Sequence, residues 1–174
     1  MLDADVDWFV RRCDCEVAFF VPNASTNGRA GTIHDIVVLL PRAPYGPLKA
    51  VLADALAQAH DAKIRFLTAM DADVSDAEVD TVQAFHDRLA DHCDSSTASE
   101  IIRTEDVTTG LVDATGSADL AIVGTMARSR IRDLFFSNRT ADLLEALPCN
   151  VLLVRPQRPR ENTQFRRLVE RFVF

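Results

Sequence analysis

The sequence predicts an α/β fold: a five-stranded parallel open sheet with helices on both faces, and an extra strand from the N-terminal region at the sheet edge. Short apolar runs rich in Val, Ile and Leu are typical of strands that are buried on both faces. Segments with apolar residues at helical spacing separate these runs, so strands and helices alternate from residue 34 onward. A chain of 174 residues is long enough for one such domain.

The N-terminal part begins with a short apolar helical piece, which is followed by a strand at Val17–Val21. Small and polar residues with two glycines then form a linker. The next strand, Ile36–Leu40, is stopped by Pro41, and a turn rich in Pro and Gly leads to a helix over Lys49–His60. The apolar residues expected on one face of this helix are Val51, Leu52, Leu56 and Ala59.

The middle of the chain continues with a strand at Lys63–Met70. Ser75 and Glu78 have the spacing of a capping box, which predicts a helix from there to about Cys93. A brief strand follows at Glu100–Arg103.

The last part holds two more strands. A helix at Val107–Thr115 ends at a glycine, and Leu120–Val123 forms the next strand. Ser137-Asn138 offer an N-cap for a helix over Asp142–Leu147, which a proline ends before the final strand at Val151–Val154.

The N-terminal segment does not fit the alternation, but it resembles the end of the chain. The spacing Cys-x-Val with a later Pro at 15–22 recurs at 149–156. We therefore expect residues 1–30 to contain the last helix and strand of a preceding copy, followed by a linker. The complete domain is expected at 31–157 and a basic, aromatic tail at 158–174.

Composition restricts the class of function. The formal charge of -7 argues against a nucleic-acid partner. Many Asp residues and only two Lys suggest an acidic surface suited to high salt, although an acidic mesophilic protein fits as well. The sequence contains neither a membrane span nor a signal-peptide pattern, and its cysteines lie in or beside apolar runs rather than in a disulfide framework. These features predict a cytoplasmic protein with reduced thiols.

Two motifs near the C-terminus carry a family resemblance. A-D-L-A-I-V-G ends at Gly124, and P-C-N-V-L-L-V-R-P ends at Pro156. Together with the opening strand, its Pro-rich turn and the helix Lys49–His60, they make residues 34–156 resemble the universal stress protein A superfamily. This resemblance implies an adenine-nucleotide alpha hydrolase-like fold.

The resemblance also points to a phosphate loop that has lost glycines. Nucleotide-binding members of the family carry G-x2-G-x9-G-[ST], in which the glycines let the backbone approach phosphates. Gly124 matches the first glycine, Ala127 stands at the second, and Ser137-Asn138 replace the Gly-Ser pair. Where the family's binders place a nucleoside-binding Asp, this chain has Pro41. We therefore expect no cofactor, with ATP or AMP as the alternative.

Arginines surround the expected phosphate position. Arg128 and Arg139 lie beside a predicted helix N-terminus, which favours anions, and Arg130 and Arg132 lie between them. They form either an anion site with Gly124, Ala127, Ser137 and Asn138, or an exposed loop that balances the acidic surface. Ser137 fits a helix N-cap equally well.

Neither catalysis nor metal binding is expected. The chain has no nucleophile elbow and no G-K-[ST] or H-E-x-x-H motif. His86 and His92 are six residues apart on different faces, so we expect a solvated helix face with one partly buried His. The C-x-C pair at Cys13 and Cys15 has no second ligand pair at finger spacing.

The resemblance implies a function through assembly. Tandem domains of this type occur on cytoplasmic tails of amino-acid transporters from salt-loving archaea, which predicts a regulatory or assembly module beside a transporter membrane domain. The last strand needs cover at its edge. Val17–Val21 can cover it within the chain, or the last strand of a second copy can do so in a homodimer. The alternative function is a stress-response sensor that binds ATP, AMP or another anion.

Overall fold

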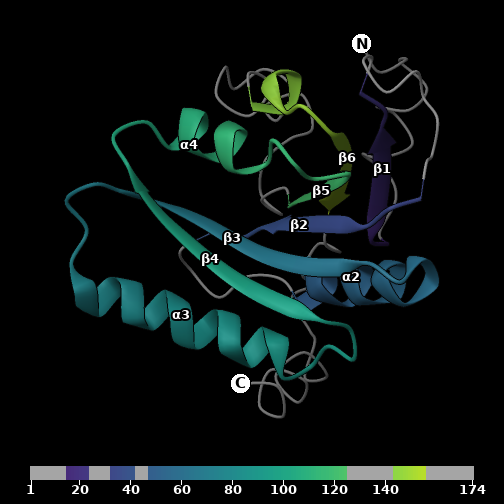
Figure 1. Cartoon of the computed structure of the whole chain (residues 1–174), viewed down its shortest axis with the longest axis horizontal. Helices are drawn as coiled ribbons and strands as arrows, with labels where there is room; N and C mark the ends of the chain where they lie inside the picture. Colours follow the sequence, from purple (N-terminus) through teal and green to yellow (C-terminus); the bar gives the residue numbers. More distant parts are fainter. Residues whose placement is uncertain (1–14, 24–31, 42–46, 125–142, 156–174) are drawn as a thin grey trace.

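A computed structural model describes residues 15–23, 32–41, 47–124 and 143–155. These residues form one six-stranded sheet in the order β1-β6-β5-β2-β3-β4, which is parallel throughout except that β1 runs antiparallel to β6 (Figure 1). The strands are β1 Val17–Val21, β2 Asp35–Leu39, β3 Lys63–Asp71, β4 Thr97–Thr104, β5 Leu120–Gly124 and β6 Asn150–Arg155. The helices are α2 Pro47–His60, α3 Asp76–Ala90 and α4 Val107–Ala114, and residues 143–146 are also helical. The predicted fold class is confirmed.

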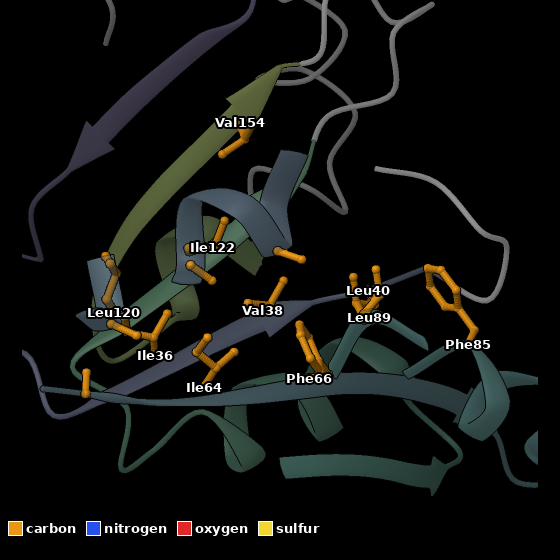
Figure 2. Close-up of a cluster of buried hydrophobic side chains, with 14 residues drawn as sticks. Ile36, Val38, Leu40, Ile64, Phe66, Phe85, Leu89, Leu120, Ile122 and Val154 are labelled. Carbon is orange, nitrogen blue, oxygen red and sulfur yellow. The ribbon is translucent and has the colours of Figure 1, made fainter. Parts of the chain in front are cut away.

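Helices cover both faces of the sheet because side chains of the inner strands alternate between them. Ile36, Val38 and Leu40 pack with α2 and α3, and Figure 2 shows this cluster around Phe66 and Ile122. Val37 and Leu39 belong to the opposite cluster, which contacts α4 and the helical residues 143–146. Every side chain of β2 from residue 36 to 39 is therefore at most 7% exposed.

The start of α3 is the capping box that the sequence predicts. The Ser75 hydroxyl accepts a hydrogen bond from the Glu78 N–H, and the Glu78 carboxylate accepts one from the Ser75 N–H. These bonds satisfy amides that have no acceptor within the helix.

The buried face of α2 differs from the predicted one. Val51 is 62% exposed and Ala59 is exposed, whereas Leu52 and Leu56 are only partly buried. The buried positions are Lys49, Ala50, Ala53 and Ala57. Small alanine side chains let the helix lie close to the sheet, so the face with the least bulk is buried rather than the most apolar one.

Strand β4 is longer than predicted. It pairs with β3 from Thr97, opposite Ile64, to Thr104, opposite Asp71. Its first three residues are Thr, Ala and Ser, which carry no apolar signal. Backbone pairing at a sheet edge does not require apolar side chains, and this explains why the sequence pattern missed them.

The N-terminal strand covers the edge of β6 within the chain, as one of the two predicted arrangements requires. Phe19 pairs with Leu153 in the middle of the ladder and packs on the second core cluster. Beyond the strand, the Asn23 side chain donates to the Leu147 carbonyl over 2.9 Å, and the Asn23 N–H donates to Asn150 Oδ1 over 3.0 Å. The edge strand is thus held by side chains as well as by the ladder.

The prediction of reduced thiols throughout is wrong at Cys15, which is disulfide-bonded. Cys15 is exposed. Cys93 and Cys149 are free, and burial raises the pKa of both thiols to about 11, which keeps them in the less reactive protonated form.

Candidate functional site

The predicted phosphate loop is described only at its first residue. Gly124 is the exposed last residue of β5. Ala127, Arg128, Ser137, Asn138 and Arg139 lie outside the described residues, as do Arg130 and Arg132.

Gly124 lies at the point where the strand order reverses. β2 is flanked by β3 on one side and by β5 on the other. The chain passes from β2 through α2 to β3 and on to β4, and then returns through α4 to β5 on the other side of β2. In open parallel sheets of this kind, ligands bind outside the carboxyl ends of the strands at such a point. The carboxyl ends of β2 and β5 are therefore the place to look for a site.

Lys49 occupies this place. It is the third residue of α2, its side chain is 6% exposed, and its Nζ donates a hydrogen bond to the carbonyl oxygen of Leu39 at the end of β2. A Cβ placed on Gly124 would lie 3.1 Å from Lys49 Cδ and Cε and 3.2 Å from Nζ. Gly124 consequently provides the room in which the lysine side chain crosses the end of β5.

Burial controls the charge of this amine. It lowers the pKa of Lys49 from 10.5 to about 8, because water no longer solvates the ammonium form. No carboxylate among the described residues forms an ion pair with Lys49. At neutral pH the group is still mainly protonated, so the site holds a positive charge that no described side chain compensates.

The chain's likeness to solved structures agrees with this architecture. A universal stress protein in complex with cAMP matches at 20% identity with a TM-score of 0.58, over 72% of this chain and 98% of its own length. A universal stress protein from Archaeoglobus fulgidus matches at 11% identity with a TM-score of 0.55, over 70% of this chain and 98% of its own. The chain has the universal stress protein fold. No family model matches the sequence, and no curated protein sequence does either.

A longer protein of unknown function from Pseudomonas aeruginosa matches over more of the chain. It is 16% identical, with a TM-score of 0.61, and the match covers 90% of this chain. The chain spans only 58% of the length of that protein.

Sequence reasoning missed Lys49, although a signal was present. Residues 49, 53 and 57 are spaced four apart on one face of α2, and the other two are alanines. Lys49 is also one of only two lysines in a chain that otherwise uses arginine as its basic residue. A rare residue type on a stripe of small residues pointed to a buried position.

The predicted solvated helix face is present at Asp87, Asp91 and His92, which are exposed. The one histidine that was expected to be partly buried, His86, is fully buried. Its Nε2 lies 2.9 Å from Thr68 Oγ1 and its Nδ1 lies 2.7 Å from Ser99 Oγ. Burial lowers the pKa of His86 to about 4 while the charge of Asp87 acts weakly in the opposite direction. The imidazole is therefore neutral at physiological pH.

The hydrogen bonds of His86 extend to the carboxyl end of β2. The Thr68 hydroxyl lies 3.3 Å from the Leu40 carbonyl, and the Ser99 hydroxyl lies 3.0 Å from Gln83 Oε1. This polar chain joins β3 and β4 to α3 and satisfies groups that would otherwise be buried without partners.

The other charged cluster lies at the opposite end of the sheet. Arg65 contacts Asp35 over 3.0 Å and Glu100 over 2.6 Å, and it donates to the Ala114 carbonyl. It ties β2, β3, β4 and α4 together near the amino ends of the strands. Among the described residues, no group of three or more His, Cys, Asp or Glu could hold a metal ion, and no helix is long and apolar enough to span a membrane.

Proposed function

We propose that the chain is a non-catalytic universal-stress-type domain that serves as a regulatory and assembly module, acting through the sheet edge at β6. The observation that carries this proposal is the antiparallel ladder between β1 and β6. A doubly wound parallel sheet ends in exposed strands, whose unpaired backbone groups attract further strands. In this chain a strand from the N-terminal region occupies that edge.

The antiparallel direction of β1 supports the proposal that this strand takes the place of the last strand of a second copy of the domain. The five parallel strands β2 to β6 complete the fold by themselves, so β1 is additional to it. Two last strands related by a twofold axis meet in the antiparallel direction, which is the direction of β1 on β6. The wider match to the longer Pseudomonas protein is consistent with a second domain of the same kind. We therefore propose that β1 belongs to a preceding copy in tandem, with a homodimer as the rival arrangement.

We further propose that the module lies in the cytoplasm and that its partner is the membrane domain of an amino-acid transporter. It is supported by the family resemblance of residues 34–156 and by the Asp-rich acidic composition, which suits a halophile. The basic, aromatic segment 158–174, outside the described residues, is the part of the chain proposed to dock on a membrane or on the domain itself.

The second candidate function is a stress-response sensor that binds ATP or AMP. It is favoured by Gly124, which lies at the carboxyl end of β5 beside β2. A solved structure of the same fold is a complex with cAMP. Thermal unfolding with Mg-ATP, AMP and phosphate tests this candidate. A ligand at a hundredfold excess over its Kd should stabilise by about 2.7 kcal/mol, which raises Tm by several degrees.

The assembly proposal is tested by adjacent phenylalanines on opposite faces of β1. Phe19 packs on the second core cluster, whereas Phe20 is 53% exposed. Phe19→Asp should detach β1, lower the free energy of unfolding by about 2 kcal/mol, and convert the chain to a dimer through the freed edge. Phe20→Asp is the matched control and should change neither property.

Light scattering gives the mass, and urea unfolding gives the stability. If Phe19→Asp leaves both the mass and the unfolding curve as in the unaltered chain, β1 does not close the assembly edge and the proposal is wrong.

A further inference from the structure

The helix α2 has one polar flank and one apolar flank, and the apolar one faces β6. Successive residues of a helix are rotated by about 100°, so Leu52 and Asp54 lie on opposite flanks of the buried Ala53. The Asp54 carboxylate accepts a hydrogen bond of 2.9 Å from the N–H of Ser95, a residue between α3 and β4. The flank with Asp54 therefore faces β4. Because β4 and β6 lie on opposite sides of β2, the flank with Leu52 faces β5 and β6.

The apolar flank is partly open to solvent. Leu48, Leu52 and Leu56 are only partly buried, and Ala59 on the same flank is exposed. Leu152 of β6 packs on the same core cluster and is also partly buried. Together these residues form the α2 flank surface.

No described helix lies over this surface. α2 itself packs on β2, β3 and β5, and α3 lies along β4 (Figure 1). α4 and the helical residues 143–146 belong to the opposite face of the sheet. A helix with apolar residues on most of its circumference is normally buried. The α2 flank surface therefore needs a further apolar segment to cover it.

The chain contains such a segment at residues 164–174. Its apolar residues Phe165, Leu168, Val169 and Phe172 have the spacing of one helix face, and arginines lie between them. A helix of this length is about 16 Å long, which is close to the length of about 20 Å expected for β6. So short a helix is marginal in water by itself, because its nucleation is costly. Its apolar face therefore requires a surface on which to pack.

The position of β6 lets this segment reach the α2 flank surface. β6 ends at Arg155 and runs parallel to β5 and β2, so this end lies at the same end of the sheet as Leu39. Lys49 in the first turn of α2 donates to the Leu39 carbonyl, which places the start of α2 there as well. Residues 156–163 can span at most about 28 Å when they are extended. The segment can thus start beside the first turn of α2 and run alongside that helix.

Charge and linkage favour this chain's own domain as the partner. Residues 158–174 contain five arginines and two glutamates, whereas the whole chain has a formal charge of -7. The segment is therefore attracted to the rest of the chain. Because it is covalently linked, its effective concentration at this surface exceeds that of a second copy in dilute solution.

We propose that residues 164–174 form a helix that docks on the α2 flank surface of the same chain. Phe165 then lies near Leu48, Phe172 lies near Ala59, and the arginines face solvent. This inference goes beyond the assembly module and does not depend on the β1–β6 ladder. It selects the domain itself, rather than a membrane, as the docking target of this segment. Any other partner of the segment has to displace it from α2.

Hydrogen–deuterium exchange of the full chain measures whether the segment is docked. Phe172 and Phe174 lie on opposite sides of a helix, so Phe172→Ser removes an anchor and Phe174→Ser is the matched control. We expect the amides of residues 168–172 to exchange about tenfold more slowly in the unaltered chain and in Phe174→Ser than in Phe172→Ser. Equal exchange rates in the three chains, whether fast or slow, would overturn the proposal.

A second pair of variants tests which surface the segment uses. Ala59 and Gln58 are adjacent and exposed, but Gln58 lies on the polar flank, where its amide donates to the Asp54 carboxylate over 2.7 Å. Ala59→Arg puts a long charged side chain on the α2 flank surface, and Gln58→Arg adds the same charge on the other flank. Ala59→Arg should raise the exchange rate of residues 168–172 about tenfold, and Gln58→Arg should leave it unchanged. Exchange that stays slow in Ala59→Arg would place the docking surface elsewhere and overturn the proposal.

Two further arms separate the rival partners. Exchange rates of residues 168–172 that are independent of protein concentration support docking within one chain. Exchange that slows as the protein concentration is raised would assign the surface to a second copy and overturn the proposal. Fast exchange in solution that becomes slow on phosphatidylglycerol vesicles would assign the segment to a membrane, with the same consequence.

Phe19→Asp keeps this test separate from that of the assembly proposal. The variant detaches β1, which is not part of the α2 flank surface, so the exchange of residues 168–172 should remain slow. Slow exchange in Phe19→Asp together with an unchanged mass would refute the role of the ladder alone. Fast exchange in the unaltered chain together with dimers of Phe19→Asp would refute the docking alone.

Discussion

Replacing Lys49 by Met should change how the free energy of unfolding depends on pH. The folded-state pKa of the amine is about 8, against 10.5 when water solvates it. Between these values the unfolded chain binds more protons than the folded chain, so the stability of the unaltered protein rises with pH. Below pH 8 the full cost of burying the charge is present, and it disappears as the pH approaches 10.5.

The magnitude follows from the two pKa values. The shift corresponds to a cost of about 3 kcal/mol at pH 7 and about 1 kcal/mol at pH 10. The Met variant carries no such cost, but it leaves the Leu39 carbonyl without its donor, which costs about 1–3 kcal/mol at every pH. The sign of the difference in unfolding free energy between Lys49→Met and the unaltered chain at one pH is therefore not decisive. Its change of about 2.5 kcal/mol between pH 7 and pH 10 is decisive.

Urea unfolding at half-unit intervals of pH, in chloride without oxyanions, measures this change. Other titrating groups are common to both proteins, so their contributions cancel in the difference. Lys63→Met supplies the control and should give a difference that does not vary with pH. A difference between the unaltered chain and Lys49→Met that stays constant within about 0.5 kcal/mol would refute the assignment of a desolvated amine.

Three further predictions concern other positions. The unaltered chain should lose about 3 kcal/mol of unfolding free energy between pH 6.5 and pH 4, because the buried imidazole of His86 stays neutral in the folded state and is protonated on unfolding. His86→Gln should remove this loss, and urea unfolding at both ends of the pH range measures it. Gly124→Ala should destabilise by about 1–2 kcal/mol by crowding Lys49, and a double-mutant cycle with Lys49→Ala should recover at least 0.5 kcal/mol of this loss; additive effects would show that the two residues do not compete for space. Asp61 has a φ of 55° just after α2, where glycine is favoured, so Asp61→Gly should raise the free energy of unfolding by about 0.5 kcal/mol, and an unchanged or lower Tm would contradict this.

The site shows clearly where sequence reasoning reaches its limit. Gly124 was predicted from the family motif as a phosphate-binding glycine, and the structure places it at the expected strand end. The space that a Cβ on Gly124 would need borders the side chain of Lys49, a residue 75 positions earlier in the chain. A motif read along one segment does not report which distant side chain fills the space beside a glycine. The residues predicted with Gly124, from Ala127 to Arg139, remain predictions.

The sequence by itself determined the order of the elements and the presence of the extra strand β1. Buried strands, capped helices and the turns between them depend on local periodicity and on residues such as Ser75 and Glu78, which act over a few positions. Only the tertiary structure decided which face of α2 is buried, how far β4 extends, and that Lys49 and His86 lose their contact with water. These properties arise when segments distant in the sequence pack together, because burial and desolvation belong to the assembled surroundings of a side chain rather than to its neighbours along the chain.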